Sequence, residues 1–357
     1  MKLLFLAIAG PAIGYGHLSR CLALADSARR QGIDSEFLVF CDDGAQSRVQ
    51  HAGYPCRIAS IAALGDAGFP DPTENFNAVV VDFSHAAVFD ELDGARRLLR
   101  RLRATAGAMM VIDALGEQTL ARRMPDMPAD VLVLPYVGAA SQRRRPWRTL
   151  AGPEYAVLAP DYANLPPRLI RQHADRVLVS CGGADPKGLT PIVLDGLELI
   201  PDRLFVRVVV GPLFGIGLID GLTVRAKESH HAIELLHAPD GLAVHMLWSD
   251  LAVAASGLIK YELAATSTPS IQISIDANHD SVNRPFARGG SVCDLGVEFD
   301  AQRLAKTTSQ LLDDATARLA MAEVGRHLVD GNGTSRLLAE LTMAAGVEKL
   351  SPQSTAE

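Results

Sequence analysis

Continuous apolar runs alternate with helix-periodic stretches through the first half of the chain. The runs are rich in Val, Ile and Leu and show no regular alternation with polar residues. Such runs are typical of strands that helices cover on both faces, as in a parallel doubly wound sheet. The expected strands are residues 3–9, 35–40, 78–82, 109–113 and 131–134, and the expected helices are residues 18–30, 44–51, 89–103 and 119–123.

A second alternating half follows residues 160–168, a segment rich in proline and turn formers. That composition predicts an interdomain linker. The pattern predicts strands at 177–180, 204–210, 251–255 and 270–275, and helices at 191–199, 232–236, 261–265, 301–312, 315–329 and 335–345. We therefore predict two parallel-sheet α/β domains, residues 1–160 and 169–345, which face each other across a cleft, and a frayed tail at 346–357.

Length and charge narrow the class of protein. The chain has 357 residues, of which 48% are hydrophobic and 21% charged. This length exceeds what one core usually spans, in agreement with two domains. The formal net charge is −7. Because nucleic-acid binding needs a basic surface, this charge argues against a nucleic-acid partner.

The cysteines and histidines show no metal-ligand spacing. The five cysteines are scattered and odd in number, which is typical of small buried residues in a reducing compartment. Among the ten histidines, His230 and His231 are adjacent, and neighbouring side chains are expected to diverge. We therefore predict no metal site.

The N-terminal apolar run is too short for a targeting segment. It reaches only to about Gly10 and lacks a basic leader, so we interpret it as a strand and not as a signal peptide. No run of about 18 apolar residues, the length that a membrane-spanning helix needs, occurs in the sequence. These observations predict a cytoplasmic protein without an integral membrane segment.

A glycine-rich turn joins the first expected strand to the first expected helix. Gly14 and Gly16 allow positive φ and close backbone approach, and His17 falls in the first turn of the helix. The free N–H groups of a helix start favour an anion or a developing negative charge. A histidine there is placed to transfer a proton near neutral pH. The alternative is a tight turn followed by an exposed histidine.

The second half begins with a similar strand, glycine turn and helix. Gly182 and Gly183 can expose backbone N–H groups, Asp185 can cap the following helix, and Pro186 fits a first helical turn. This segment is a candidate diphosphate cradle. It matches neither a P-loop nor the dinucleotide fingerprint, because the required lysine or third glycine is missing.

Two more expected strands of the second half also end in polar residues. Ser256 and Gly257 follow one strand, and Glu262 lies in the next helix, where its carboxylate can accept hydrogen bonds from the two hydroxyls of a ribose. The alternative for Glu262 is an acid that the helix macrodipole favours. Asn278 and His279 follow the next strand. Because carboxyl ends of parallel strands share one edge, these residues are expected on the ligand-binding side.

Together these segments resemble a known family. Residues 14–25, which read GYGHLSRCLALA, are similar to the signature of the pseudaminic-acid pathway UDP-sugar hydrolase and its spore-coat-polysaccharide relatives. Those proteins have the GT-B glycosyltransferase fold, with two Rossmann-like domains. Further matching stretches are residues 80–82, 150–156, 181–186, 189–190, 256–257 and 261–263, which occur in family order within about residues 1–290.

The resemblance implies a UDP-sugar that is cleaved at its anomeric C–O bond with inversion, without a metal or a cofactor. It makes His17 the catalytic residue that activates water, and Glu262 the ribose-binding residue. The loop from Gly182 would meet the diphosphate, and the product would be a free amino sugar for surface or flagellar glycan synthesis. The further substrate contacts it implies are Gly14, Tyr15, Gly16, Arg20, Asp82, Ser84, His85, Gly183, Ser256, Gly257, Lys260, Asn278 and His279.

The chain departs from the family pattern at three places on the substrate side. Ser84 stands where the hydrolase carries a tyrosine, residues 258–260 replace a Ser-Thr-Thr, and residues 134–136 replace an asparagine-bearing strand end. The sugar therefore stays open. Lys260 is an alternative phosphate contact that would suit a transferase or another nucleotide, and Tyr136 or His85 is a candidate replacement for the tyrosine.

Three functions are compatible with this pattern. The first is the hydrolase, and the second is a GT-B glycosyltransferase in which His17 deprotonates an acceptor hydroxyl instead of water. No membrane-facing helix rich in Lys and aromatics is evident, which argues against a lipid acceptor. The third is a non-catalytic nucleotide-sugar-binding protein, but a scaffold has no need of Gly14, Gly16 and His17 together. The oligomeric state stays open.

Overall fold

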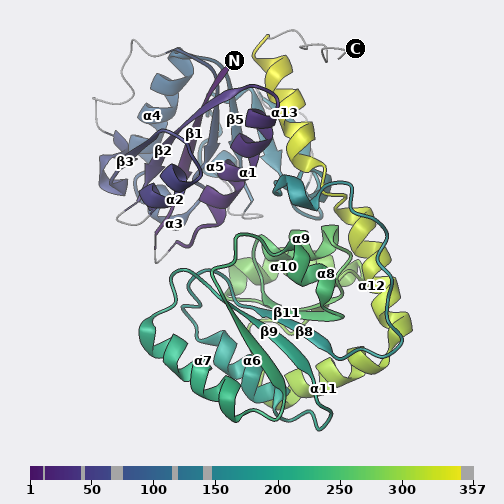
Figure 1. Cartoon of the computed structure of the whole chain (residues 1–357). Helices are drawn as coiled ribbons and strands as arrows, with labels where there is room; N and C mark the ends of the chain where they lie inside the picture. Colours follow the sequence, from purple (N-terminus) through teal and green to yellow (C-terminus); the bar gives the residue numbers. More distant parts are fainter. Residues whose placement is uncertain (11–12, 42–44, 66–74, 115–119, 140–146, 347–357) are drawn as a thin grey trace, which may run out of the picture.

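Parallel strands form two separate sheets, each belonging to one α/β domain. The computed structural model describes residues 1–10, 13–41, 45–65, 75–114, 120–139 and 147–346. Within these ranges the first sheet has the strand order β3-β2-β1-β4-β5-β6-β7, and the second has the order β10-β9-β8-β11-β12-β13. Figure 1 shows the two domains one above the other, with the N-terminal domain on top. The predicted fold class is confirmed.

The elements of the N-terminal domain follow the predicted alternation. Its strands are β1 (Lys2–Ile8), β2 (Asp34–Phe40), β3 (Cys56–Ala59), β4 (Phe76–Asp82), β5 (Ala106–Ile112), β6 (Val131–Leu134) and β7 (Arg148–Ala151). Its helices are α1 (Gly16–Arg30), α2 (Ala45–His51), α3 (Ala86–Phe89), α4 (Leu92–Ala104) and α5 (Leu120–Arg123). Three 3-10 turns, η1 (Ile61–Gly65), η2 (Pro153–Tyr155) and η3 (Pro160–Tyr162), complete it.

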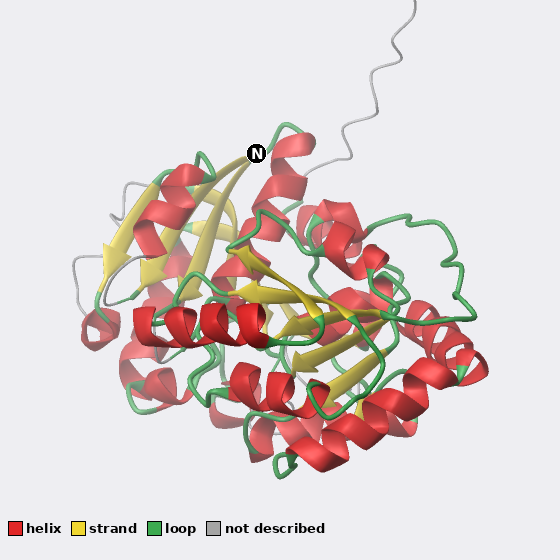
Figure 2. Ribbon diagram, turned by 60° about the horizontal axis from the view of Figure 1, so that its bottom comes forward, coloured by secondary structure: helices red, strands yellow, loops and turns green. Residues whose placement is uncertain are grey.

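The second domain repeats this architecture. Its strands are β8 (Arg176–Ser180), β9 (Phe205–Val210), β10 (Ala232–His237), β11 (Leu251–Ala255), β12 (Ser270–Ile273) and β13 (Cys293–Asp294). Its helices are α6 (Leu189–Leu197), α7 (Ile216–Glu228), α8 (Ala243–Trp248), α9 (Ile259–Ala265), α10 (Ala277–Arg288), α11 (Ala301–Asp313) and α12 (Ala315–Leu328). Figure 2 shows helices on both sides of the strands of this domain.

Burial on both faces explains the continuous apolar strands. In β1, Phe5 belongs to the core on the α1 side with Leu24, whereas Leu6 belongs to the core on the α4 side with Leu98. Successive residues of a strand point to opposite faces, so both faces need apolar side chains. Each large apolar side chain that becomes fully buried contributes about 1.5–3 kcal/mol.

The last helix, α13 (Gly333–Ala344), returns to the N-terminal domain. Its Leu337 and Leu341 are buried in the core on the α1 side, and its Glu340 pairs with Arg148 at 2.8 Å. Figure 1 shows α13 beside α1, although α12 lies on the lower domain. This differs from the predicted division, which assigned residues up to 345 to the second domain. Most of the predicted tail, residues 347–357, lies outside the described residues.

Two chain segments therefore cross between the domains, and they are fastened to each other. The Leu158 N–H donates to Thr334 Oγ1 at 3.1 Å, and the Thr334 hydroxyl donates to the Leu158 carbonyl at 2.6 Å. Gly331 has φ 78° and lies so close to the Tyr162 carbonyl that a Cβ would overlap it. Figure 1 shows the teal linker running beside the segment between α12 and α13.

One predicted helix is wrong. Residues 232–236 form β10, which pairs in parallel with β9 from Ala232 opposite Phe205 to His237 opposite Val210. Ile233 packs against the second-domain core on the α6 side, and Glu234 points to the other face. A window of five residues fits either period, so the pairing with β9 decides the structure.

Several short or solvated elements are absent from the sequence prediction. They are β3, β7, β13, α7, α8 and α10, all of which carry weak apolar signals. In α7, for example, only Leu222 is buried. Among the described residues, no helix has the length and apolar character to cross a bilayer. All five cysteines are described, and each is a free thiol.

Candidate functional site

Each sheet reverses its strand order at one point. In the first sheet β1 lies beside β4, and in the second β8 lies beside β11. Open α/β sheets bind ligands outside the carboxyl ends of the strands at such a switch point. His17 follows β1 and Asp82 ends β4, while Gly182 follows β8 and Ser256 follows β11. The predicted site residues therefore lie at both switch points.

The first glycine turn delivers His17 to the start of α1. Gly14 has φ 80°, a conformation that glycine adopts without strain, and its N–H donates to the Gly10 carbonyl at 2.7 Å. The helix begins at Gly16, so His17 lies in its first turn as predicted. A Cβ on Gly14 would meet no atom within 4 Å, so its backbone borders open space.

His17, Arg20 and Asp82 form a hydrogen-bonded group that we call the histidine cluster. His17 Nδ1 lies 2.7 Å from Asp82 Oδ1. Arg20 Nε donates to Asp82 Oδ2 at 2.6 Å, and Arg20 Nη2 donates to Oδ1 at 2.9 Å. Asp82 is fully buried, and His17 and Arg20 are 7% and 9% exposed. The carboxylate thus holds both side chains in fixed orientations.

The ionised carboxylate fixes the tautomer of His17. Burial alone would raise the pKa of Asp82, but the charges and hydrogen bonds of Arg20 and His17 lower it below its ordinary value. An ionised carboxylate only accepts hydrogen bonds, so Nδ1 carries the proton and donates to Asp82. Arg20 Nη2, 3.0 Å from Nδ1, cannot also donate to it. Nε2 therefore has a free lone pair.

Nε2 of His17 is available for proton transfer. Within the described part of the chain, no side chain or backbone group hydrogen-bonds to it. The side chain is 9% exposed, so a reactant reaches Nε2 only through this small part of the ring. Asp82 and Arg20 were predicted to contact substrate. Because the Asp82 carboxylate is fully enclosed, it acts on the ring of His17 instead.

His85 stands near His17. It is the N-cap of α3, and its Nδ1 accepts from the Ala87 N–H at 3.2 Å, which places the ring proton on Nε2. The centroids of the two imidazoles are 6.5 Å apart, and the rings are nearly perpendicular. Burial and the nearby His17 lower the pKa of His85, which favours its neutral form. His85 is partly buried, so it can still face a ligand.

Asp113 is a buried acid at this edge that sequence reasoning missed. It directly follows β5, the neighbour of β4, and it is fully buried. Its Oδ2 accepts from the Ala121 N–H at 3.2 Å. Burial raises its pKa to about 7, although the Ala121 N–H and the hydroxyl of Ser84 oppose this. Ser84 is 1% exposed beside it, so the predicted substrate contact of Ser84 is not seen in this structure.

The glycine loop of the second domain presents backbone rather than side chains. Gly182 has φ 85°, and a Cβ on it would meet no atom within 4 Å. The Gly183 carbonyl accepts from the Leu213 N–H at 2.9 Å. Within the described residues, the N–H groups of Gly182 and Gly183 donate to no protein acceptor. These two donors can therefore bind an anion.

Asp185 changes the expected role of the next helix. Its Oδ1 accepts from the Leu189 N–H at 2.7 Å, and its Oδ2 accepts from the Thr190 N–H at 2.8 Å. The first donors of α6 are thus already bound by a carboxylate of the protein. Pro186 precedes the helix, which begins at Leu189 rather than at the proline. A diphosphate would meet the glycine backbone and not the start of α6.

Glu262 lies in the first turn of α9, as the sequence predicts. It follows Ser256 and Gly257, and a Cβ on Gly257 would meet no atom within 4 Å. Burial raises the pKa of Glu262 to about 7, and a hydrogen bond from Tyr162 opposes this effect. The residue is only partly buried, so its carboxylate can still reach a ligand.

Lys260 does not face a ligand in this structure. It is 3% exposed, and its Nζ donates to Asn283 Oδ1 at 3.1 Å. Burial lowers its pKa to about 7, with only partial compensation from Asp294. The predicted contact between Lys260 and a phosphate therefore corresponds to a buried amine that belongs to the packing of α9 against α10.

Asn278 and His279 occupy the first turn of α10. Asp276 caps this helix: its Oδ1 accepts from the His279 N–H at 2.9 Å and lies 2.8 Å from His279 Nδ1. Asn278 is exposed and His279 is partly exposed. Both stay predictions as substrate contacts.

The two domains meet at the candidate site. A Cβ on Gly183 would lie 4.0 Å from the ring of Tyr15, which precedes α1. Tyr261 of α9 is 6% exposed and close enough to Arg20 for the two to influence each other's pKa. Gly183 and Tyr261 bring the second domain against the histidine cluster. Tyr261 is a further residue at the site that the sequence did not single out.

The side chains of His230 and His231 do not diverge as predicted. Their ring centroids are 4.0 Å apart, and their nitrogens lie with a Glu198 oxygen in a group that spans at most 4.8 Å. His230 Nε2 lies 3.0 Å from the Ile200 carbonyl, and His231 Nε2 lies 2.8 Å from the Leu197 carbonyl. Carbonyls only accept, so both Nε2 atoms carry protons and are not metal ligands.

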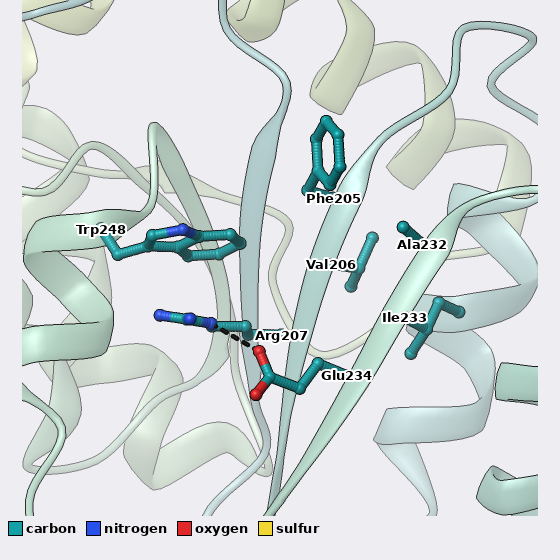
Figure 3. Close-up of a pocket in the computed structure, with 7 residues that line it drawn as sticks. All are labelled: Phe205, Val206, Arg207, Ala232, Ile233, Glu234 and Trp248. Atoms are coloured by element: carbon teal, nitrogen blue, oxygen red, sulfur yellow. Dashed lines mark hydrogen bonds and ion pairs between the residues drawn. The ribbon is translucent and has the colours of Figure 1, made fainter.

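A pocket of about 240 Å³ lies elsewhere on the second domain (Figure 3). Figure 3 shows the Arg207 guanidinium facing the Trp248 ring, 4.1 Å from its centroid, and bonded to Glu234 at 2.9 Å. The pocket borders the amino ends of β9 and β10, where Phe205 and Ala232 begin the strands. The loops described above follow the carboxyl ends of β8 and β11. This pocket is therefore separate from the candidate site.

Comparisons with known proteins identify distant relatives. No family model matches the chain. The spore coat polysaccharide biosynthesis protein SpsG of Bacillus subtilis is 27% identical over 202 residues, 54% of this chain and 58% of that protein. An uncharacterized protein of Methanocaldococcus jannaschii is 22% identical over 76% of this chain and 55% of its own length. The matches thus span little more than half of these relatives. The chain is a distant homologue of SpsG.

Solved structures share the whole two-domain arrangement. MurG of Acinetobacter baumannii has a TM-score of 0.68 at 14% identity, covering 96% of this chain and 100% of that chain. UDP-GlcNAc 2-epimerase of Neisseria meningitidis, bound to UDP-GlcNAc, has 0.62 at 13% identity with the same coverage. Anabaena HepE, in complex with UDP and glucose, has 0.58 at 15% identity, again with the same coverage. The chain has the GT-B fold.

Proposed function

We propose that this protein binds a UDP-sugar between its domains and hydrolyses it at the anomeric C–O bond with inversion, releasing a free amino sugar for surface or flagellar glycan synthesis. The distant homology to SpsG, a polysaccharide biosynthesis protein, supports the biological context. The shared fold of HepE with UDP and glucose, and of the epimerase with UDP-GlcNAc, supports the class of ligand.

The observation that carries the proposal is the hydrogen bond between His17 Nδ1 and Asp82 Oδ1, 2.7 Å long, at the switch point of the first sheet. It leaves the lone pair of Nε2 unused at the face where Gly183 of the second domain approaches Tyr15. A general base needs this combination of a free lone pair and a fixed ring.

The chemical step follows from this geometry. Nε2 of His17 takes a proton from water as the water oxygen attacks the anomeric carbon on the face opposite the nucleotide. The bond between that carbon and the phosphate oxygen breaks, and its electron pair leaves with UDP. His17 becomes an imidazolium, which the buried Asp82 carboxylate stabilises through Nδ1. Attack from the opposite face inverts the anomeric centre.

The second domain supplies the contacts to the nucleotide. The free N–H groups of Gly182 and Gly183 offset the negative charge that the departing diphosphate gains. Glu262, which has room for further hydrogen bonds, receives the ribose hydroxyls. The proposed reaction involves no metal ion, and the charge on the leaving group is balanced by these backbone donors.

Nucleotide release in the absence of an acceptor tests the proposal. The protein is incubated with a panel of UDP-sugars and CMP-sugars, and free nucleotide is measured with time. We expect UDP release from at least one UDP-sugar and none from the His17→Gln variant. Release only after addition of a hydroxyl acceptor would instead identify a glycosyltransferase with the same donor site. Tight UDP-sugar binding without either reaction would indicate a binding protein.

A further inference from the structure

We propose that Tyr162, a residue of the interdomain linker, forms part of the ribose subsite by holding the Glu262 carboxylate in the orientation that receives two ribose hydroxyls. This inference rests on the proposed function, because it needs a nucleotide at Glu262. It assigns a ligand-positioning role to the linker, which otherwise only connects the domains.

The ring of Tyr162 is anchored in the second domain. Tyr162 is the last residue of η3 and is 4% exposed. Its ring belongs to the same buried cluster as Tyr261 and Leu263, the residues on either side of Glu262. The aromatic body is therefore immobilised by the helix that carries the carboxylate, and the hydroxyl has a defined position relative to α9.

Two neighbours determine which way the Tyr162 hydroxyl points its proton. The hydroxyl is hydrogen-bonded to the Glu262 side chain and to the backbone N–H of Leu242. An N–H group only donates, so the hydroxyl oxygen accepts from Leu242 and its own proton goes to Glu262. Burial and the Glu262 charge raise the pKa of Tyr162 above its ordinary value, so the hydroxyl keeps this proton.

The Glu262 carboxylate keeps acceptor sites for a ligand. Among the described residues, Tyr162 is the only side chain that hydrogen-bonds to it. A carboxylate offers about four lone-pair sites, so one bond from Tyr162 leaves enough for two ribose hydroxyls. Without the tyrosine, a partly exposed glutamate samples several rotamers, and ordering one on binding costs about 0.5–1.5 kcal/mol. The contact from Tyr162 removes part of this cost.

The linker backbone fixes Tyr162 from the other side. The Tyr162 N–H donates to the Ala159 carbonyl at 3.1 Å, and its own carbonyl lies against Gly331. Gly331 belongs to the segment that leads back to the N-terminal domain. Both chain crossings between the domains thus position the hydroxyl that contacts Glu262.

Titration calorimetry with two nucleotides tests the role of Tyr162. UDP has both ribose hydroxyls, whereas 2′,3′-dideoxy-UDP lacks them and keeps the base and the diphosphate. For the full-length Tyr162→Phe variant we expect about tenfold weaker binding of UDP, the size of one lost hydrogen bond to a charged group. We expect the affinity for 2′,3′-dideoxy-UDP to stay within about twofold, because that ligand does not use Glu262.

Two further variants make the result specific. Tyr155→Phe removes a hydroxyl from another partly buried linker tyrosine, in η2, and is expected to leave both affinities unchanged. In a Glu262→Gln background, the Tyr162→Phe substitution should lose most of its effect on UDP, because the two side chains act as a pair.

The possible outcomes separate the inference from the proposed function. If the wild-type protein binds UDP but Tyr162→Phe leaves UDP affinity unchanged, or weakens both ligands equally, the inference is overturned and the proposed function stands. If the wild-type protein binds neither nucleotide, the proposed function and this inference are both overturned. A loss confined to UDP supports the role of Tyr162.

Discussion

The two domains place different groups at corresponding strand ends. At the switch point of the first sheet, the histidine cluster joins three ionisable side chains by hydrogen bonds of 2.6–3.0 Å. At the switch point of the second sheet, the loop from Gly182 offers free backbone N–H groups, and Glu262 is only partly buried. The first arrangement orients a proton acceptor, and the second leaves donors and acceptors open for a ligand.

This difference separates catalysis from binding in physical terms. A buried side-chain cluster is costly to desolvate and becomes stable only when every charge is paired, so it resists substitution and holds one geometry. Backbone donors carry no side-chain entropy and tolerate several ligands of similar charge. We therefore expect substitutions in the first domain to affect turnover and folding, and substitutions in the second domain to affect nucleotide affinity.

The largest effect on turnover is expected from His17→Gln. Removing the general base should lower kcat by about 10³-fold, within the range of such losses, and leave the affinity for UDP nearly unchanged. Steady-state kinetics and calorimetry on one preparation measure both. A variant with full turnover, or one that loses UDP binding in proportion, would contradict the division between the domains.

Asp82→Asn should affect both turnover and folding. The amide cannot balance Arg20, and a buried charge without its partner costs about 3–5 kcal/mol of stability. The amide can also donate to His17 Nδ1, which favours the wrong tautomer and lowers kcat by about 10²-fold or more. Chemical denaturation and kinetics check these effects. Asp34→Asn, at the exposed start of β2, is the matched control and should change neither.

Asp113 provides a contrast to Asp82 within the same sheet. Burial raises its pKa to about 7, whereas Arg20 and His17 lower the pKa of Asp82. A carboxyl whose pKa is higher in the folded state loses stability as the pH rises, here from about 4 through about 7, by up to about 4 kcal/mol. Asp113→Asn should remove this loss. Denaturation midpoints that fall equally in both proteins between pH 5 and pH 8 would contradict it.

In the second domain, UDP affinity should depend on the ionisation of Glu262. Its pKa of about 7 means that the carboxyl is protonated and a poorer acceptor below pH 7. We expect UDP binding to weaken by about tenfold between pH 8 and pH 6. Glu262→Gln should bind UDP with low affinity throughout and lose most of this dependence. The same pH profile in both proteins would assign the effect to the phosphate instead.

The smallest effect is expected from metal removal. Because the N–H groups of Gly182 and Gly183 are proposed to balance the leaving group, EDTA should leave the rate unchanged. A rate that falls in EDTA and returns with a divalent cation would show that these donors are insufficient.

Much of the fold could be predicted because the strands are long apolar runs. The strand predicted at residues 251–255 coincides with β11, and the histidine predicted in the first helical turn is there. The helix predicted at 232–236 failed because five apolar and polar residues fit both periods and only pairing with β9 distinguishes them. The position of α13 depends on contacts between residues far apart in the chain, such as Arg148 with Glu340.

The candidate site could be predicted in its residues but not in its bonds. The sequence indicates His17, Asp82 and Glu262, but not that Asp82 is enclosed and serves His17 rather than a substrate. Lys260 was expected to face a phosphate, yet burial of α9 against α10 turns its amine toward Asn283. Asp113 had a visible signal, an acid directly after a buried strand, whereas Tyr162 lies in a linker and had none.

The central claim is that Nε2 of His17 activates water against the anomeric carbon of a UDP-sugar. Its most direct test is turnover in water enriched in ¹⁸O, followed by mass spectrometry of both products. The account predicts ¹⁸O in the released sugar, none in UDP, and no release by His17→Gln. Appearance of ¹⁸O in the phosphate of UDP, or undiminished release by that variant, would contradict it.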